Sequence, residues 1–284
     1  MNPLLLGVAA AIGWGVADYL AALTTRRLGT LRTSLGMQAS SLVLIALAAA
    51  SIGQLPPLTP ATLGYAALMG ALGGVMLAAL YRALALGPIA IVSPVAAANA
   101  AITVVLAVAL LGERLSLMQV AAITATIGGV ALASTDLRIV RETLGRPSDG
   151  VRLALLAMLG FGVLGFLLAT VSRSYGALPM VVLLRAGTTA LLVAFAAARR
   201  PPLAVPTAAA AVMVLIGIVD TGGNLAYGYG ATLGYASIVA TASSAYPLIP
   251  FVLGVTVLRE RIAPNQLAGV TLLLLGLLLL GVST

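Results

Sequence analysis

The chain contains an internal repeat in which positions separated by 147 residues match without a gap. Leu86-Gly87 recurs as Leu233-Gly234, and Glu113-Arg114 recurs as Glu260-Arg261. Each half holds about five apolar segments long enough to cross a bilayer. Because five crossings is an odd number, the second half must be inverted relative to the first. The repeat therefore predicts an all-α membrane protein of ten transmembrane helices, built as two inverted five-helix repeats at residues 1–140 and 150–284.

Composition supports this class, since 61% of the residues are hydrophobic and 8% are charged, against about 45–50% and 25% in soluble domains. The chain has no cysteine and no histidine, which excludes disulfides, thiolate nucleophiles and the usual zinc sites. We expect no cofactor and no bound metal. The polar stretch 136–150 is the linker between the halves. The predicted spans lie near residues 3–25, 33–53, 61–86, 89–111, 116–135, 151–172, 178–198, 207–232, 236–258 and 264–283.

Arginine supplies all fifteen basic residues of the chain and dominates its net charge of +8. These arginines flank apolar segments and form no single basic stripe, so a nucleic-acid partner is not expected. If ten spans alternate, twelve arginines fall on one side, Arg114 and Arg173 fall on the other, and Arg185 lies too deep to assign. The positive-inside rule then places both termini on the non-cytoplasmic side of the inner (plasma) membrane.

Polar and kinked segments mark a candidate cavity, because polar groups inside spans are costly unless they face protein or water. In the ninth predicted span, Ser244, Tyr246, Pro247 and Pro250 interrupt an apolar segment. The fourth span has the parallel features Pro94 and Asn99, and Asn99 occupies the repeat position of Tyr246. Each proline removes a helical hydrogen bond and introduces a bend. We predict Pro94, Pro247 and Pro250 as hinges around a site near the membrane midplane.

The eighth predicted span adds Asp220, Asn224 and Tyr227, which share a face at helical spacing. Asp220 could bind a substrate ammonium group, carry a proton, or pair with Arg185, and all three roles stay open. Asp18 in the first span invites the same roles, and its nearness to the Arg26-Arg27 pair favours a structural one.

Five aromatic residues lie deep within spans and either line the cavity or pack against other helices: Trp14, its repeat mate Phe161, Tyr81, Tyr227 and Tyr246. If they line it, an amphipathic solute is favoured, since rings stack on rings and hold ammonium groups by cation–π contact. The predicted substrate-binding set is Trp14, Tyr81, Asn99, Asp220, Asn224, Tyr227, Ser244 and Tyr246.

The two Glu-Arg motifs also allow two interpretations. Ser116 and Gln119 have capping-box spacing at the start of the fifth span, and Pro264 suits the first turn of the tenth. Glu113 and Glu260 precede those helix starts, where the helix dipole favours negative charge. They either stabilise the point where the chain enters the membrane or form a gate-like contact.

These motifs resemble a known family. The Leu86-Gly87-Pro88 turn, the run Ile91-Val92-Ser93-Pro94-Val95 and the phrase Leu111-Gly112-Glu113-Arg114 are similar to the EamA domain of the drug/metabolite transporter (DMT) superfamily. The second half repeats the pattern more loosely. The resemblance implies a ten-helix transporter with helices 3, 4, 8 and 9 around a central cavity. Many such proteins export amino acids or related metabolites, and the aromatic amino acid exporters of the YddG type are one branch. Many are drawn with cytoplasmic termini, from which the arginine count departs.

We therefore expect a non-enzymatic exporter of neutral, including aromatic, amino acids or related metabolites, working by alternating access without chemistry. A nucleotide-sugar, sugar-phosphate or lipid carrier on the same fold is the alternative, and it would need Arg82 or Arg185 in the cavity for a phosphate. An intramembrane enzyme is disfavoured because Ser244 has no base near it except a distant Asp. The partners expected are a small-molecule substrate and the lipid bilayer. A monomer can function because both halves are present, and a dimer stays open.

Overall fold

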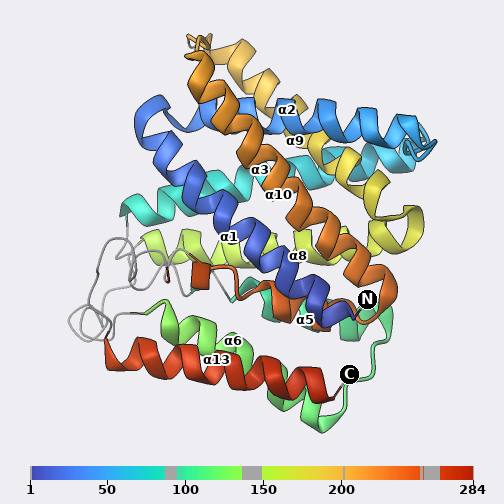
Figure 1. The fold of residues 1–284 in the computed structure, drawn as a ribbon, viewed down its shortest axis with the longest axis vertical. Helices are drawn as coiled ribbons and strands as arrows, with labels where there is room; N and C mark the ends of the chain where they lie inside the picture. Colours follow the sequence, from blue (N-terminus) through green and yellow to red (C-terminus); the bar gives the residue numbers. More distant parts are fainter. Residues whose placement is uncertain are drawn as a thin grey trace.

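The computed structural model describes residues 2–86, 95–96, 98–135, 149–200, 202–249, 252 and 263–283, and within these ranges every regular element is a helix (Figure 1). Caps predicted from the sequence are present at two helix starts. Ser116 and Gln119 form a reciprocal capping box, and Pro264 occupies the first turn of the last helix. The helices are α1 Pro3–Leu28, α2 Thr30–Ser51, α3 Pro60–Leu86, α5 Asn99–Leu111, α6 Leu117–Ala133, α8 Asp149–Tyr175, α9 Ala177–Arg199, α10 Thr207–Leu233, α11 Ala236–Ser243 and α13 Pro264–Val282.

The bundle has the surface of a membrane protein. Within the described part, seven helices are long and apolar enough to span a bilayer, and α5 and α6 are shorter apolar helices. Large apolar side chains such as Leu117 (87% exposed) and Leu278 (68% exposed) cover the outside, where lipid rather than water would meet them. The architecture fits two repeats of the predicted kind, and the count of ten spans stays a prediction.

The two halves run in opposite directions through the bundle. Pro3, at the start of α1, packs against Gly234, and the Arg173 side chain near the end of α8 donates a hydrogen bond to the Gly234 carbonyl oxygen at 2.7 Å. The beginning of α1 and the end of its repeat counterpart α8 therefore lie at the same end of the molecule. This is the end that carries both chain termini in Figure 1, and we call it the terminal end. The opposite end, where α1 finishes with Arg26 and Arg27, is the arginine-rich end.

Helices of one half pack mainly on helices of the other. α1 lies along α10 and α11, and its counterpart α8 lies along α3 and α5. Two repeat-related glycines make matching contacts in this arrangement. A Cβ added to Gly15 would lie 2.6 Å from the Tyr246 carbonyl oxygen, and one added to Gly162 would lie 2.7 Å from that of Asn99. The halves are thus interlocked by close backbone approach that only glycine allows.

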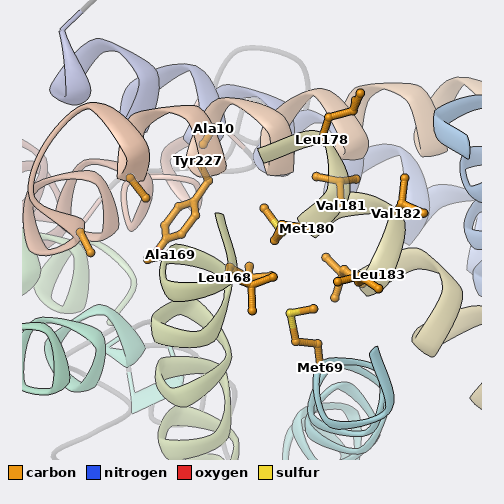
Figure 2. Close-up of a cluster of buried hydrophobic side chains, with 14 of the residues drawn as sticks. Ala10, Met69, Leu168, Ala169, Leu178, Met180, Val181, Val182, Leu183 and Tyr227 are labelled. Atoms are coloured by element: carbon orange, nitrogen blue, oxygen red, sulfur yellow. The ribbon is translucent and has the colours of Figure 1, made fainter. Parts of the chain in front are cut away.

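The largest buried apolar cluster fills the terminal end of the bundle (Figure 2). In Figure 2, Met180 and Leu183 of α9 converge with Leu168 of α8 and Met69 of α3, while Tyr227 of α10 lies beside Ala169. The start of α9 is so enclosed that each residue from Ala177 to Arg185 is buried. This cluster packs helices of both halves together at the terminal end.

Candidate functional site: a central break in the bundle

Two helices break at repeat-related positions midway through the bundle. α11 ends at Ser243, whereas the sequence predicted one helix over 236–258. Beyond that residue, the Leu248 and Ile249 amides donate to carbonyl oxygens three residues earlier, at 2.9 and 3.2 Å. The same three-residue spacing occurs at the start of α5, where the Ala101 amide donates to the Ala98 carbonyl oxygen at 3.0 Å. Such tight turns mark a helix that is interrupted rather than continuous.

Pro247 explains the break in the second half. Its nitrogen carries no hydrogen, so it cannot complete the helical bond to the Ser243 carbonyl. The Tyr246 amide takes that place and donates to the Ser243 oxygen at 3.1 Å. Helical hydrogen bonding is therefore interrupted at Pro247, and its role as a hinge stays a prediction. Pro94, Pro250 and the side chain of Tyr81 lie outside the described residues.

Trp14 and Tyr227 form an aromatic pair between α1 and α10. Their ring centroids are 5.5 Å apart with a tilt of 32°. The Tyr227 hydroxyl donates to the Gly165 carbonyl oxygen at 3.0 Å, and this residue is 2% exposed. Tyr227 is thus packed, while Trp14 is half-buried and presents part of its surface. Gly223 makes room for the indole ring, because a Cβ there would lie 2.8 Å from a carbon of that ring.

The other predicted polar residues fall into two groups, those that are buried and those that are half-buried. Asn224 and Ser244 are buried, and each donates to a nearby backbone carbonyl on its own segment, at 2.8 and 2.7 Å. Asn99 is half-buried at the break and donates to the Ala96 carbonyl oxygen at 3.0 Å. Tyr246 is half-buried at the other break. Trp14, Asn99 and Tyr246 are therefore the members of this set with accessible side-chain surface beside a break or between α1 and α10.

A buried charged network crosses the middle of the bundle. Arg185 of α9 is 1% exposed and pairs with Asp220 of α10. Its other terminal nitrogen donates to the Gln38 side-chain oxygen of α2 at 2.6 Å. Among the roles left open for Asp220, pairing with Arg185 is the one present in this conformation. Sequence reasoning missed Gln38, although a signal existed, since Gln38 occupies the repeat position of Arg185.

Asp18 differs from Asp220 in having no ionic partner. The ion pairs among the described residues join Arg152 to Asp149, Arg173 to Glu113 and Arg185 to Asp220. Arg26 and Arg27 therefore do not hold Asp18, against the structural role that its position favoured. Asp18 keeps accessible surface as a residue, although α1 is packed against three other helices and protein atoms surround the carboxyl group. It lies within electrostatic range of Asp220 and of Tyr246.

Glu113 accepts a compact set of hydrogen bonds at the terminal end. It accepts from the Arg173 guanidinium at 2.8 Å, from the Ala236 and Ser237 amides at 2.6 and 3.1 Å, and from the Ser237 hydroxyl at 2.6 Å. Arg173 in turn donates to the Ala231 carbonyl oxygen at 2.8 Å. The helix start that Glu113 stabilises is thus that of α11, in the other half, and not that of α6. We call Glu113, Arg173 and Ser237 the terminal latch.

Arg173 is a member of the latch that sequence reasoning did not select as a functional residue. A pocket at the surface of the terminal end is lined by Glu113, Arg173 and residues 231–235, so the latch forms part of its wall. The repeat could have drawn attention to Arg173. Arg173 occupies the repeat position of Arg26, and Glu260 occupies the repeat position of Glu113.

Comparison with known proteins agrees with this architecture. A solved crystal structure superposes with a TM-score of 0.72 at 19% sequence identity, over 99% of this chain and 97% of the other. At that identity the similarity shows the shared fold. No curated protein matches the chain in sequence. The sequence model of the EamA-like transporter family matches residues 1–135 and again residues 149–282. Because that family is matched over both halves, the chain is a membrane transporter that belongs to the EamA-like transporter family, within the DMT superfamily.

Proposed function

We propose that the protein exports neutral amino acids, aromatic ones included, or closely related metabolites, by alternating access around the central breaks. The observation that carries the proposal is the pair of interrupted helices at Asn99 and Tyr246, at the same repeat position. Interrupted helices at repeat-related positions are where transporters of inverted repeats hold their substrates. The half-buried Trp14 and Tyr246 side chains beside them suit a solute with an apolar or aromatic body.

Charge at the centre supports an amino acid over a phosphorylated substrate. A phosphate would require a free cation in the cavity. Arg185 is fully buried and already bonded to Asp220 and Gln38, and Arg82 is exposed near the end of α3. Neither arginine, among the described residues, is available at the breaks. The sugar-phosphate and nucleotide-sugar alternatives are therefore less well supported.

Alternating access is supported by the difference between the two ends. The terminal end holds the largest apolar cluster and the latch, whereas Asp18 toward the other end is exposed. In an inverted-repeat transporter, one end is closed while the other admits substrate. We propose that this conformation is closed at the terminal end and accessible from the arginine-rich end.

The test is uptake into proteoliposomes that contain the purified full chain. Radiolabelled phenylalanine, threonine, methionine and glucose 6-phosphate are compared, with and without a pH gradient. We expect saturable uptake of the amino acids, lost in Asn99→Ala and kept in Tyr229→Ala, since Tyr229 is 47% exposed on the outer surface of α10. Uptake of glucose 6-phosphate alone would replace this proposal with the phosphate-carrier alternative.

We also propose that both termini face away from the cytoplasm, on the strength of the arginine distribution. The chain contains no cysteine, so a single introduced cysteine is a unique label site. We expect Ser283→Cys to react with a membrane-impermeant maleimide in intact cells. Reaction only after the cells are permeabilised would reverse the orientation.

A further inference from the structure

We propose that Asp18 is the subsite that binds the ammonium group of the substrate, so that the transporter selects for a primary amine and tolerates loss of the carboxylate. This inference rests on the proposed function and refines it, because it names the charged group that the central site recognises. It begins from a contrast between two carboxylates of the same interior. Asp220 is bonded to Arg185, while no hydrogen bond or ion pair within the described residues reaches Asp18.

The position of Asp18 on α1 directs it toward the break in the second half. Residues three and four apart share a helix face. Asp18 follows Gly15, which packs against the Tyr246 carbonyl of the broken ninth span, by three residues. It follows Trp14, which packs against Gly223 of α10, by four. Asp18 therefore lies toward the seam between α10 and the break after α11, where protein atoms surround its carboxyl group although the residue keeps accessible surface.

The surroundings of Asp18 favour a cation over any other occupant. Asp18 interacts electrostatically with Asp220 and with the Tyr246 phenol. No arginine of the described residues pairs with it. A carboxylate left unpaired inside a span is expensive and marks a functional group with an absent partner. An ammonium group would supply that partner, and Trp14 one turn away offers a partly exposed ring for the apolar body or for cation–π contact.

The second half has no equivalent of this carboxylate. The repeat position of Asp18 is Gly165, whose carbonyl oxygen accepts the Tyr227 hydroxyl at 3.0 Å. The corresponding space in the other half is thus closed by an aromatic side chain. A single carboxylate on one side of the centre orients the substrate, since the ammonium group has one place to go.

The experiment compares three ligands that share a phenyl ring. Phenylalanine carries both charged groups, 2-phenylethylamine lacks the carboxylate, and 3-phenylpropionate lacks the amine. Binding is read as the shift in Tm of the purified full-length protein, and transport as uptake into proteoliposomes. The variants are Asp18→Asn, Asp18→Glu and, as the matched control, Asp149→Asn. Asp149 has a side chain 81% exposed at the start of α8, far from the break.

We expect wild type and Asp149→Asn to bind phenylalanine and 2-phenylethylamine and to ignore 3-phenylpropionate. Asp18→Asn should weaken both amines at least about tenfold, the loss typical of one charge-assisted hydrogen bond, while Asp18→Glu retains part of the binding. Three results would each overturn the inference. Wild type could bind 3-phenylpropionate as well as it binds the amines, Asp18→Asn could bind the amines unchanged, or wild type could bind neither amine. Amine binding without amino acid flux would keep the subsite and reject the proposed function.

A second variant tests the geometry without any substrate. Asp18→Cys supplies the chain with its only thiol. We expect an impermeant maleimide to label it from the arginine-rich end, and 2-phenylethylamine to slow that labelling by occupying the neighbouring space. A thiol that no aqueous reagent reaches from either side would show that position 18 faces no open cavity, and the inference would fail.

Discussion

Replacing Glu113 by glutamine should open the terminal end of the transporter. The carboxylate accepts four hydrogen bonds, and the residue is 5% exposed. Glutamine keeps one acceptor oxygen, but its NH₂ group would face the donors of Arg173 or Ser237. Breaking a fully buried ion pair costs about 3–5 kcal/mol. The Arg173 side chain is 28% exposed, so water solvates the guanidinium once the pair is broken. We therefore expect a smaller cost of about 2–3 kcal/mol.

This loss of free energy should make the apolar cluster beneath the latch more accessible to water. A shift of about 2–3 kcal/mol raises the open fraction by up to about 30- to 150-fold. Ala240 is 3% exposed in α11 and belongs to the cluster, so Ala240→Cys reports opening through its rate of maleimide labelling. The matched control is Arg114→Gln, which removes an exposed charge from the same loop. If Glu113→Gln labels no faster than Arg114→Gln, the latch does not hold this end closed.

Two further predictions concern the middle of the bundle. Gly15→Ala would place a Cβ 2.6 Å from the Tyr246 carbonyl oxygen, and overpacking of about 1–3 kcal/mol should lower Tm and uptake together. Gly128→Ala is its control, since a Cβ there meets nothing within 4 Å, and equal behaviour of the two would contradict the contact. Arg185→Met leaves Asp220 unpaired in the bilayer and should destabilise the protein by about 3–5 kcal/mol in detergent unfolding. Adding Asp220→Asn should restore most of the loss, and no recovery would show that the pair is not its source.

The fold class was predictable because hydrophobicity and repetition act over long stretches of chain. Helix caps were predictable as well, since Ser116 with Gln119 depends only on residues three apart. The predicted ninth helix over 236–258 ended early at Ser243 because Pro247 removes the amide that would continue it. Proline was recognised in the sequence as a source of bending. Whether a given proline bends or interrupts a helix depends on contacts such as that of Gly15, which spacing alone does not reveal.

The candidate site was harder to predict because burial and pairing arise from residues far apart in the chain. Asp18 and Asp220 look alike in sequence, each an acid inside a span. Only packing shows that Asp220 has a guanidinium partner 35 residues away, and that Arg26 and Arg27 do not serve Asp18. Tyr227 was similarly ambiguous, and its burial follows from the position of Gly165 on another helix.

The hydrogen bond between Arg185 and Gln38 joins a residue to its own counterpart, since the two are 147 positions apart. A residue that touches its counterpart lies on the axis that relates the two halves. In a dimer of identical five-helix subunits, that axis would have to carry two arginines, which repel, or two glutamines, which bring no charge. Two halves of different sequence, here joined in one chain, let a cation on one side meet a neutral amide on the other. The single chain thereby places one guanidinium on its axis of symmetry, where the Asp220 carboxylate pairs with it, so the two halves cannot exchange roles at this point.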